Sequence, residues 1–196
     1  MSKLLPKFRL SVKYIFAFIY AVVFLMPFFA YAQDPNFHIY IALGQSNMDG
    51  AGDIESQDKQ GVDSRFQVLY GVNCPQANKS VGNWYKADPP ICRCNSGLSP
   101  MDYFGREMLN NVPNDIKIGV ISVAVGGAKI ELFNKRTYES YINNEAPDWM
   151  LNWINEYQGN PYQRIIELAQ IAKQDGIIKG IMLHQGESNT GDQQWP

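Results

Sequence analysis

The sequence lacks the excess of basic residues that nucleic-acid-binding proteins carry. Its 196 residues include 17 Lys and Arg against 19 Asp and Glu, which gives a formal net charge of −2. Residues 1–32 hold four of the basic residues and no acidic one, so the rest of the chain carries a net charge of −6. We therefore expect no nucleic-acid partner, and the mildly acidic balance suits an uncharged ligand.

Cysteine and histidine are scarce as well. The three cysteines, Cys74, Cys92 and Cys94, lie close together, with no histidine and no fourth cysteine nearby. A structural zinc site would need four such ligands, so we expect no metal there. In an oxidising compartment one disulfide is expected, which joins Cys74 to either Cys92 or Cys94 and leaves one cysteine over.

The one long uncharged run of the chain lies near its N-terminus. Residues 14–29 follow a basic start and precede Ala-Tyr-Ala at residues 30–32. This order is typical of a signal peptide, here cleaved after Ala32, and the run is shorter than the about 20 residues that span a bilayer. We therefore expect a secreted or periplasmic protein, with residues 1–32 as signal peptide, residues 33–196 as one domain, and no stable membrane span after cleavage. An uncleaved membrane anchor is the alternative.

Patterns of strand and helix alternate beyond the leader. Nearly continuous apolar runs at residues 37–43, 116–125 and 177–183 predict strands buried on both faces, as in a parallel sheet. A helix is predicted from Ser99 to about residue 111, and another opens at residues 160–161, each with a cap and a first-turn proline. The fold class expected from these patterns is α/β.

Two segments are less regular. Residues 50–98 are rich in Gly, Asn, Asp, Pro and Ser, which predicts a long irregular excursion that carries specificity. Residues 131–158 are mixed, with Trp149 and Trp153 at helical spacing. We interpret these two indoles as packing residues rather than as a carbohydrate platform.

Each predicted strand is followed by a polar, glycine-bearing loop. These are Gly-Gln-Ser-Asn-Met at residues 44–48, Val-Gly-Gly-Ala-Lys-Ile at 125–130 and His-Gln-Gly-Glu-Ser-Asn at 184–189. In an open parallel sheet, ligands bind at the carboxyl ends of the strands. If the three strands are neighbours, the three loops converge there.

These loops hold the groups that acyl transfer through serine requires. Ser46 supplies a hydroxyl at the end of a strand, although a helix N-cap is the plain structural interpretation of a serine there. The backbone N–H groups of Ser46 and Gly127 and the side-chain amide of Gln185 are candidate donors to an oxyanion. For Asn47 and Asp49 we favour ordinary turn chemistry over a role in holding Ser46.

The three motifs, in this order, resemble the blocks of the sialate O-acetylesterase and acetylxylan esterase group, that is, carbohydrate esterase family 6 and its relatives among the SGNH-type hydrolases. The resemblance implies a flavodoxin-like three-layer αβα sandwich with a parallel sheet, and hydrolysis of O-acetyl esters on sugars without metal or organic cofactor. It implies Ser46 as the nucleophile and Ser46, Gly127 and Gln185 as the oxyanion hole. Glu187 matches the acid of the third block, which either orients the catalytic histidine or supports the loop.

The chain departs from that group in its histidines. The resemblance places the catalytic histidine in a later Asp-x-x-His block, whereas this sequence holds only His38 and His184. We therefore expect an esterase domain that is incomplete at its C-terminus, without the last part of the sheet and a covering helix. The alternative is a non-catalytic or inactive carbohydrate-binding fragment of the same group; a lipase or thioesterase fits less well, because its Gly-x-Asn-Asp block is absent.

Overall fold

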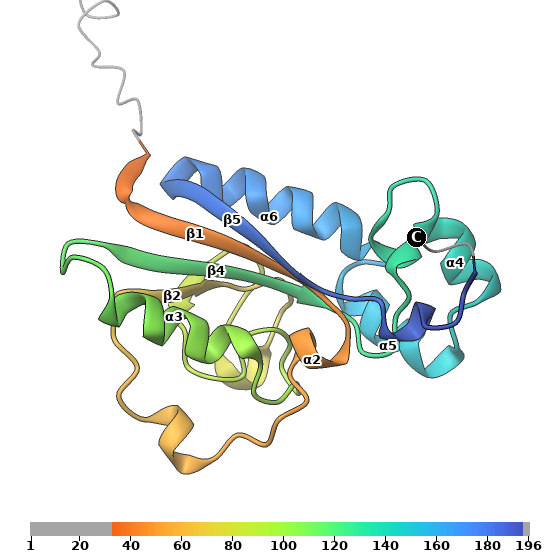
Figure 1. Ribbon diagram of the computed structural model, residues 1–196, viewed down its shortest axis with the longest axis horizontal. Coiled ribbons are helices and arrows are strands. Elements are labelled where there is room, and N and C mark those ends of the chain that lie inside the picture. The colour runs from red at the N-terminus through yellow and green to blue at the C-terminus, as the bar shows by residue number, and fades with distance from the viewer. Residues whose placement is uncertain (1–32, 194–196) are drawn as a thin grey trace, which may run out of the picture. The chain divides into compact units, whose positions relative to one another are not determined.

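A computed structural model describes residues 33–193, which form an α/β unit around a five-stranded sheet (Figure 1). The strands are β1 (Asp34–Gly44), β2 (Phe66–Leu69), β3 (Trp84–Lys86), β4 (Lys117–Ala124) and β5 (Gly176–His184). The α-helices are α2 (Ser46–Asp49), α3 (Pro100–Asn110), α4 (Tyr138–Asn144), α5 (Asp148–Glu156) and α6 (Pro161–Asp175). Short 3-10 turns are η1 (Ser56–Lys59), η2 (Pro75–Ala77), η3 (Ile130–Phe133) and η4 (Glu187–Asn189). The predicted signal peptide, residues 1–32, lies outside the described residues.

The strand order is β3-β2-β4-β1-β5, and only β3 runs antiparallel to its neighbour. β1 therefore lies between β4 and β5, parallel to both. Gly44, the last residue of β1, is in register with Ala124 of β4 and with His184 of β5. The three strands predicted from the apolar runs thus end at one edge of the sheet.

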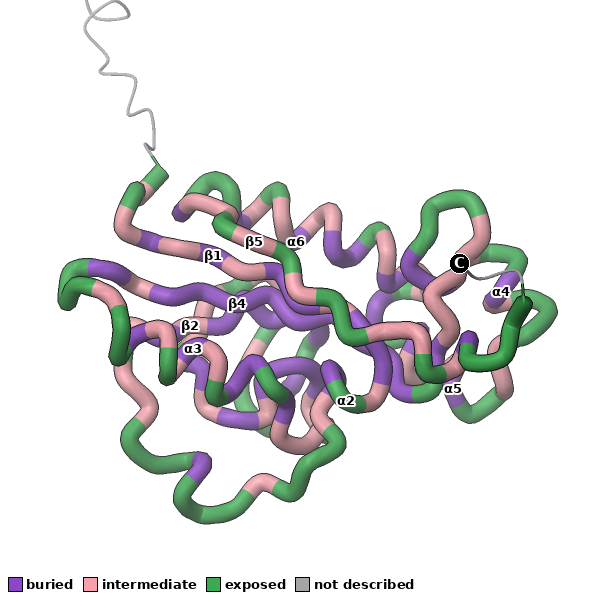
Figure 2. Tube along the Cα trace, in the orientation of Figure 1, coloured by how far each residue is buried: buried purple, intermediate pink, exposed green. Residues whose placement is uncertain are grey.

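Helices cover both faces of the sheet (Figure 1). α6 packs against β1, β4 and β5, and α3 packs against β2 and β4. β4, in the middle of the sheet, is buried along almost its whole length, whereas β5 is mostly half-buried or exposed (Figure 2). The predicted three-layer α/β class is confirmed, because strands buried on both faces need helices on both sides.

Helix boundaries follow the predicted caps. Ser99 caps α3: its hydroxyl accepts from the Met101 N–H, and the Asp102 carboxylate accepts from the Ser99 N–H in return. The Asn160 side chain caps α6 by accepting from the Gln163 N–H. Such caps satisfy N–H groups that have no partner inside the helix.

The segment of residues 50–98 is more ordered than its composition suggests. It contributes β2 and β3 to the sheet, and β2 pairs directly with β4. Beyond these strands it is held by the Cys74–Cys94 disulfide, which settles the partner of Cys74 and leaves Cys92 as a buried free thiol. Because the two bonded sulfurs cannot bind a metal, the cysteines do not form a zinc site.

β5 is the outer strand beside β1 within the described part of the chain. Two of its apolar side chains, Ile181 and Leu183, are 67% and 54% exposed. They alternate with half-buried Met182, as expected for a strand with one face covered and one open. Within residues 33–193, the helices are all too short or too polar to cross a bilayer.

Candidate active site

Backbone contacts bring the three loops together at the carboxyl ends of β1, β4 and β5. The Gln45 N–H donates to the His184 carbonyl at 3.2 Å, and the Val125 N–H donates to the Gly44 carbonyl at 3.2 Å. A Cβ on Gly44 would lie 2.1 Å from the His184 carbonyl oxygen. Glycine at this position is therefore what lets β1 and β5 approach closely enough to join their loops.

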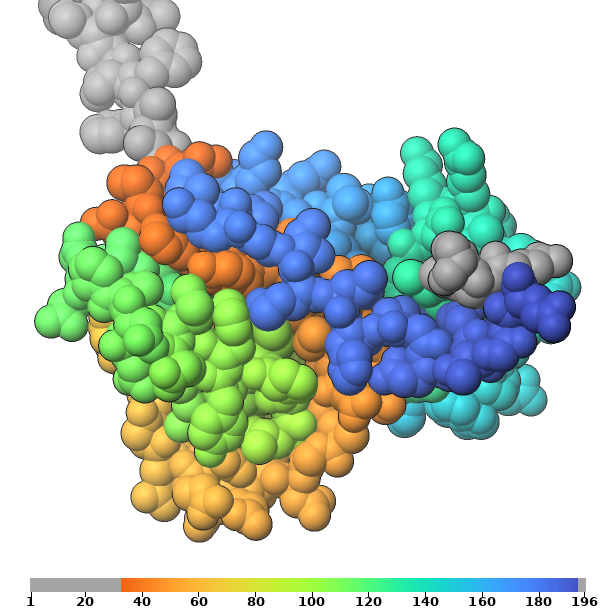
Figure 3. Space-filling view, in the orientation of Figure 1, coloured from red at the N-terminus to blue at the C-terminus, as the bar shows by residue number. Residues whose placement is uncertain are grey.

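Side chains of the third loop tie it to the second. Gln185 Nε2 donates to the Ala128 carbonyl at 2.7 Å, and Asn189 Oδ1 accepts from the Ile130 N–H at 3.1 Å. The Ser188 hydroxyl lies 2.9 Å from the Gly127 carbonyl. The convergence predicted from strand order is thus present as direct contacts between segments far apart in the chain (Figure 3).

One of these side chains also reaches the first loop. The Ser188 hydroxyl lies 2.8 Å from Gln45 Oε1, in addition to its contact with Gly127. Ser188 therefore links its own loop, the third, to the other two: to the second loop through Gly127, and to the first loop through Gln45, which directly precedes Ser46. The sequence offered no signal for this role, because a serine in a turn is common.

Ser46 begins α2 and is half-buried. The N-cap of that short helix is Gln45, so the interpretation of Ser46 as an N-cap is wrong. Its hydroxyl makes no hydrogen bond with any residue of the described chain. An uncommitted, partly accessible hydroxyl at a strand-to-helix turn has the position that nucleophilic catalysis uses.

The second loop presents Gly127 to solvent, whereas Gly126 is buried. Gly127 has a φ of +72°, which L-residues with a side chain rarely adopt. Its N–H bonds to no residue among 33–193. In the third loop, Gln185 Oε1 is buried without a hydrogen-bond partner in the same part of the chain. Within the described chain, the Gly127 N–H therefore remains without a partner at the loop edge, whereas the Gln185 amide oxygen is buried and its nitrogen donates to Ala128.

Glu187 connects the third loop to α2. Its Oε1 accepts from Asn47 Nδ2 at 3.1 Å and lies 3.4 Å from His184 Nε2. Burial raises the pKa of Glu187, but its own backbone N–H, Asn47 and the neighbouring His184 outweigh that effect and leave the pKa below its ordinary value. Asn47 thus has a bonding role across the loops, beyond the ordinary turn chemistry we had favoured.

The two histidines lie at different ends of this arrangement. His38 is in β1, six residues before Gly44, a distance of about 20 Å along a strand. His184 ends β5 and borders a shallow hollow of about 460 Å³ together with Asn47 and Pro100. Only His184 is therefore near the loop edge, and its side chain is 49% exposed.

A buried ion pair joins α2 to the 50–98 segment. Asp49 accepts two hydrogen bonds from Arg93, at 3.0 and 2.6 Å, and both side chains are more than nine-tenths buried. Arg93 also bonds Glu156 of α5 at 3.1 Å. Sequence reasoning missed Arg93, because it lies in the irregular 50–98 segment, where no local pattern marks it.

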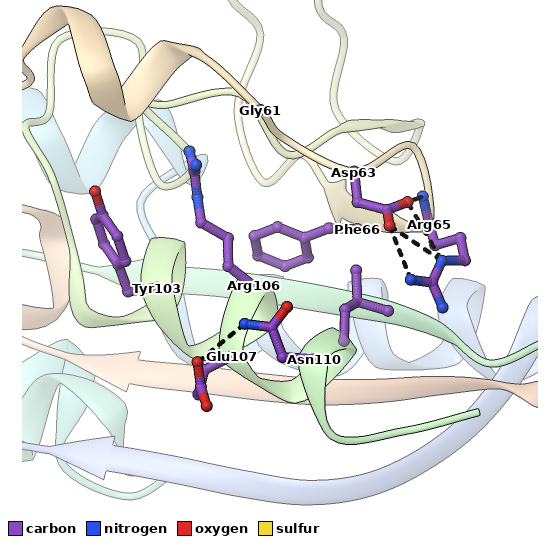
Figure 4. Close-up of a pocket in the computed structure, with 9 residues that line it drawn as sticks. Gly61, Asp63, Arg65, Phe66, Tyr103, Arg106, Glu107 and Asn110 are labelled. Atoms are coloured by element: carbon purple, nitrogen blue, oxygen red, sulfur yellow. Dashed lines mark hydrogen bonds and ion pairs between the residues drawn. The ribbon is translucent and has the colours of Figure 1, made fainter. Parts of the chain in front are cut away.

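A second hollow lies away from the loops, between residues 61–66 and α3 (Figure 4). It measures about 640 Å³ and contains two arginines. Arg65 is paired with Asp63 at 2.8 Å, and Arg106 donates to the main-chain carbonyls of Asp58 and Gln60. These cations support the loop around them. Within residues 33–193, no cluster of His, Cys, Asp and Glu is arranged to hold a metal ion.

Comparison with known protein families gives a match over residues 36–196. The matching family is described as carbohydrate esterase, sialic acid-specific acetylesterase. The chain belongs to this carbohydrate esterase family. The resemblance noted from the three motifs is thereby confirmed, and the match includes all three loops.

Three solved structures are similar to this family member, and the first of them supports the same fold. A protein from Arabidopsis thaliana is 21% identical, with a TM-score of 0.55 over 79% of this chain and 59% of its own. A carbohydrate acetylesterase from Xanthomonas citri is 23% identical, with a TM-score of 0.49 over 79% of this chain and 33% of its own. NanS is 15% identical, with a TM-score of 0.48 over 80% and 56%. The chain thus spans less than two thirds of the length of each.

Proposed function

We propose that this carbohydrate esterase family member hydrolyses O-acetyl esters on sugars through an acetyl-serine intermediate formed on Ser46. The observation that carries the proposal is the meeting of the three loops beside the turn that holds Ser46, whose hydroxyl has no hydrogen-bond partner in the described part of the chain. The family match supports the ester and the carbohydrate. The leader-like N-terminus supports a secreted or periplasmic location.

In the proposed reaction, Ser46 Oγ attacks the acetyl carbonyl carbon and loses its proton to a base. The carbonyl oxygen becomes an oxyanion, which in this proposal accepts hydrogen bonds from the backbone N–H groups of Ser46 and Gly127 and from the side-chain amide of Gln185. The C–O bond to the sugar then breaks, and the sugar oxygen takes a proton. Water hydrolyses the acetyl-serine and releases acetate, which restores the hydroxyl.

Within this proposal, Glu187 is a positioning residue. Its carboxylate holds Asn47 beside the nucleophile and lies close to His184. No residue of this chain is assigned as the base, because His38 is too distant and His184 is the third-block residue that the family resemblance treats as structural. The base is thus left open to experiment.

The test is covalent labelling of the full chain. A fluorophosphonate probe is expected to modify Ser46, and p-nitrophenyl acetate is expected to leave an acetyl group on the peptide that contains it. Ser46→Ala should abolish both signals, and Ser140→Ala on the exposed surface of α4 serves as the matched control. Labelling that persists in Ser46→Ala would falsify the nucleophile assignment.

A carbohydrate-binding protein without chemistry is the second candidate. The observation in its favour is that His184, the histidine near the loops, lies beside Glu187 and makes no hydrogen bond with Ser46 within residues 33–193. Binding of an acetylated sugar without any modification of Ser46 would support this candidate. Measuring binding and labelling on the same preparation separates the two functions.

A further inference from the structure

Trp149 is an exposed indole at the edge of the candidate site. It lies in α5 and is 53% exposed, although large apolar side chains are usually buried. A Cβ on Gly127 would lie 2.9 Å from Trp149 Cη2, so the indole borders the loop that carries Gly127. The interpretation of both indoles as packing residues fits Trp153, which packs against the core, but not Trp149, which is about half exposed.

The indole of Trp149 rests on a rigid support. It contacts Trp153 edge-to-face, with ring centroids 5.3 Å apart. The Arg93 guanidinium lies 4.5 Å from the centroid of the Trp153 ring. Arg93 is in turn bonded to Asp49, three residues after Ser46. A continuous chain of contacts thus joins the exposed indole to the helix of the proposed nucleophile.

We propose that Trp149 is a sugar-stacking platform that positions the pyranose ring carrying the acetyl ester at the loop edge. This inference rests on the proposed function and names its substrate-positioning residue. One face of a pyranose ring presents C–H groups and is apolar, while its hydroxyls point outward. An exposed indole offers a flat apolar surface of matching size and loses little entropy on binding, because it is already held in place.

Trp149 lies beside the loop that carries Gly127, as a sugar-positioning residue must. Trp153 borders Gly126 and Trp149 borders Gly127, since a Cβ on Gly126 would lie 2.8 Å from Trp153 Cζ3, and Gly127 itself stays exposed. A sugar stacked on Trp149 therefore lies next to Gly127, the proposed oxyanion donor. Burying a half-exposed indole under the ring also removes apolar surface from water.

Trp149 differs in its surroundings from Tyr103, another exposed aromatic residue. Tyr103 of α3 is 48% exposed, close to the value for Trp149, but it borders the separate hollow of Figure 4 and bonds Asp58 through its hydroxyl. It is the matched control, because it offers similar aromatic exposure away from the three loops.

The experiment measures binding of acetylated sugars to the full chain by calorimetry and by saturation-transfer NMR. The probes are an O-acetylated xylo-oligosaccharide and 9-O-acetyl-N-acetylneuraminic acid, which report the two ring types separately. For at least one of them, Trp149→Ala should raise the Kd about tenfold, equivalent to about 1.4 kcal/mol. Trp149→Phe should raise it less, and Tyr103→Ala should leave it within twofold.

Two further measurements separate this inference from the proposed function. NMR should show saturation transfer to ring C–H protons, and those contacts should disappear in Trp149→Ala while the chain stays folded by circular dichroism. Ser46→Ala should keep the wild-type Kd, so a failed nucleophile assignment leaves this test intact. An unchanged Kd in Trp149→Ala for both probes, or no binding of either by the wild-type chain, overturns the inference.

Discussion

Asp49 and Arg93 form a buried, doubly hydrogen-bonded ion pair directly beneath the turn that carries Ser46. The two bonds measure 3.0 and 2.6 Å, and the Arg93 side chain is only 5% exposed. Burial lowers the pKa of Arg93, but the hydrogen bonds and charge of Asp49 outweigh it and raise the pKa above its ordinary value. Arg93 therefore stays protonated, and the pair joins α2 to the 50–98 segment.

Removing one member of this pair should destabilise the fold strongly. Arg93→Met leaves the buried Asp49 carboxylate without its partner, and Asp49→Asn leaves the buried Arg93 with Glu156 alone, so we expect each to lower the free energy of unfolding by about 3–5 kcal/mol. Urea titration followed by fluorescence measures this. Lys86→Ala removes the exposed Lys86–Asp88 pair and should cost about 1 kcal/mol or less. Losses of similar size in all three variants would contradict a special role for the buried pair.

The three cysteines should differ sharply in reactivity. The Cys74–Cys94 disulfide closes a loop with a sequence separation of 20, so its reduction should lower the free energy of unfolding by about 3 kcal/mol. Burial raises the pKa of Cys92 to about 12, which leaves almost no thiolate at neutral pH. An aromatic disulfide reagent should find no thiol in the native oxidised chain and one after unfolding in urea. Rapid native labelling of Cys92 would contradict its burial.

The carboxyl group of Glu187 should titrate below the ordinary range of a glutamate. Hydrogen bonds favour its charged form in the folded state, so its stabilising contribution is present above the unfolded-state pKa and is lost as the pH falls through the lower folded-state value. Asn47→Ala removes one donor and should raise this pKa in a carboxyl-carbon NMR titration. Asn110→Ala removes a similar bond to Glu107 at 3.1 Å and should leave Glu187 unchanged. A Glu187 pKa that does not change in Asn47→Ala would contradict the role of the Asn47 hydrogen bond in lowering it.

Gln185 and Ser188 should affect the reactivity of Ser46 in different ways. If Gln185 is an oxyanion donor, Gln185→Ala should lower the rate of acetylation about 100-fold with little change in sugar binding. Ser188→Ala removes contacts among the three loops and should reduce labelling of Ser46 by a few fold, as expected for one lost hydrogen bond of about 1 kcal/mol. Rates of fluorophosphonate labelling measure both. The reverse order of effects would indicate that Gln185 acts only through its bond to Ala128.

Much of the fold was predictable because its patterns are local. Continuous apolar runs marked β1, β4 and β5, and the cap of α3 was visible in Ser99 and Asp102. The rule that ligands bind at the carboxyl ends of parallel strands places the three motifs at one edge from the sequence alone. Short β2 and β3 were hidden in residues 50–98, because three or four residues carry too little periodicity to mark a strand.

The candidate site was predictable in its backbone but less so in its side chains. Ser46, Gly127, Gln185 and Glu187 follow from motifs that sit directly after strands. Ser188 could not be predicted as the residue that contacts all three loops, since its partners lie far away in the chain.

The sequence by itself determined β1, β4 and β5, the capped helices α3 and α6, and the motifs that mark the family, because each motif and element depends on residues close together in the chain. Only the tertiary structure decided that Cys74 pairs with Cys94, that Arg93 reaches Asp49, and that Trp149 is exposed while Trp153 is partly covered. Spacing places two indoles on one face of a helix, but which parts of that face are covered depends on packing between distant segments.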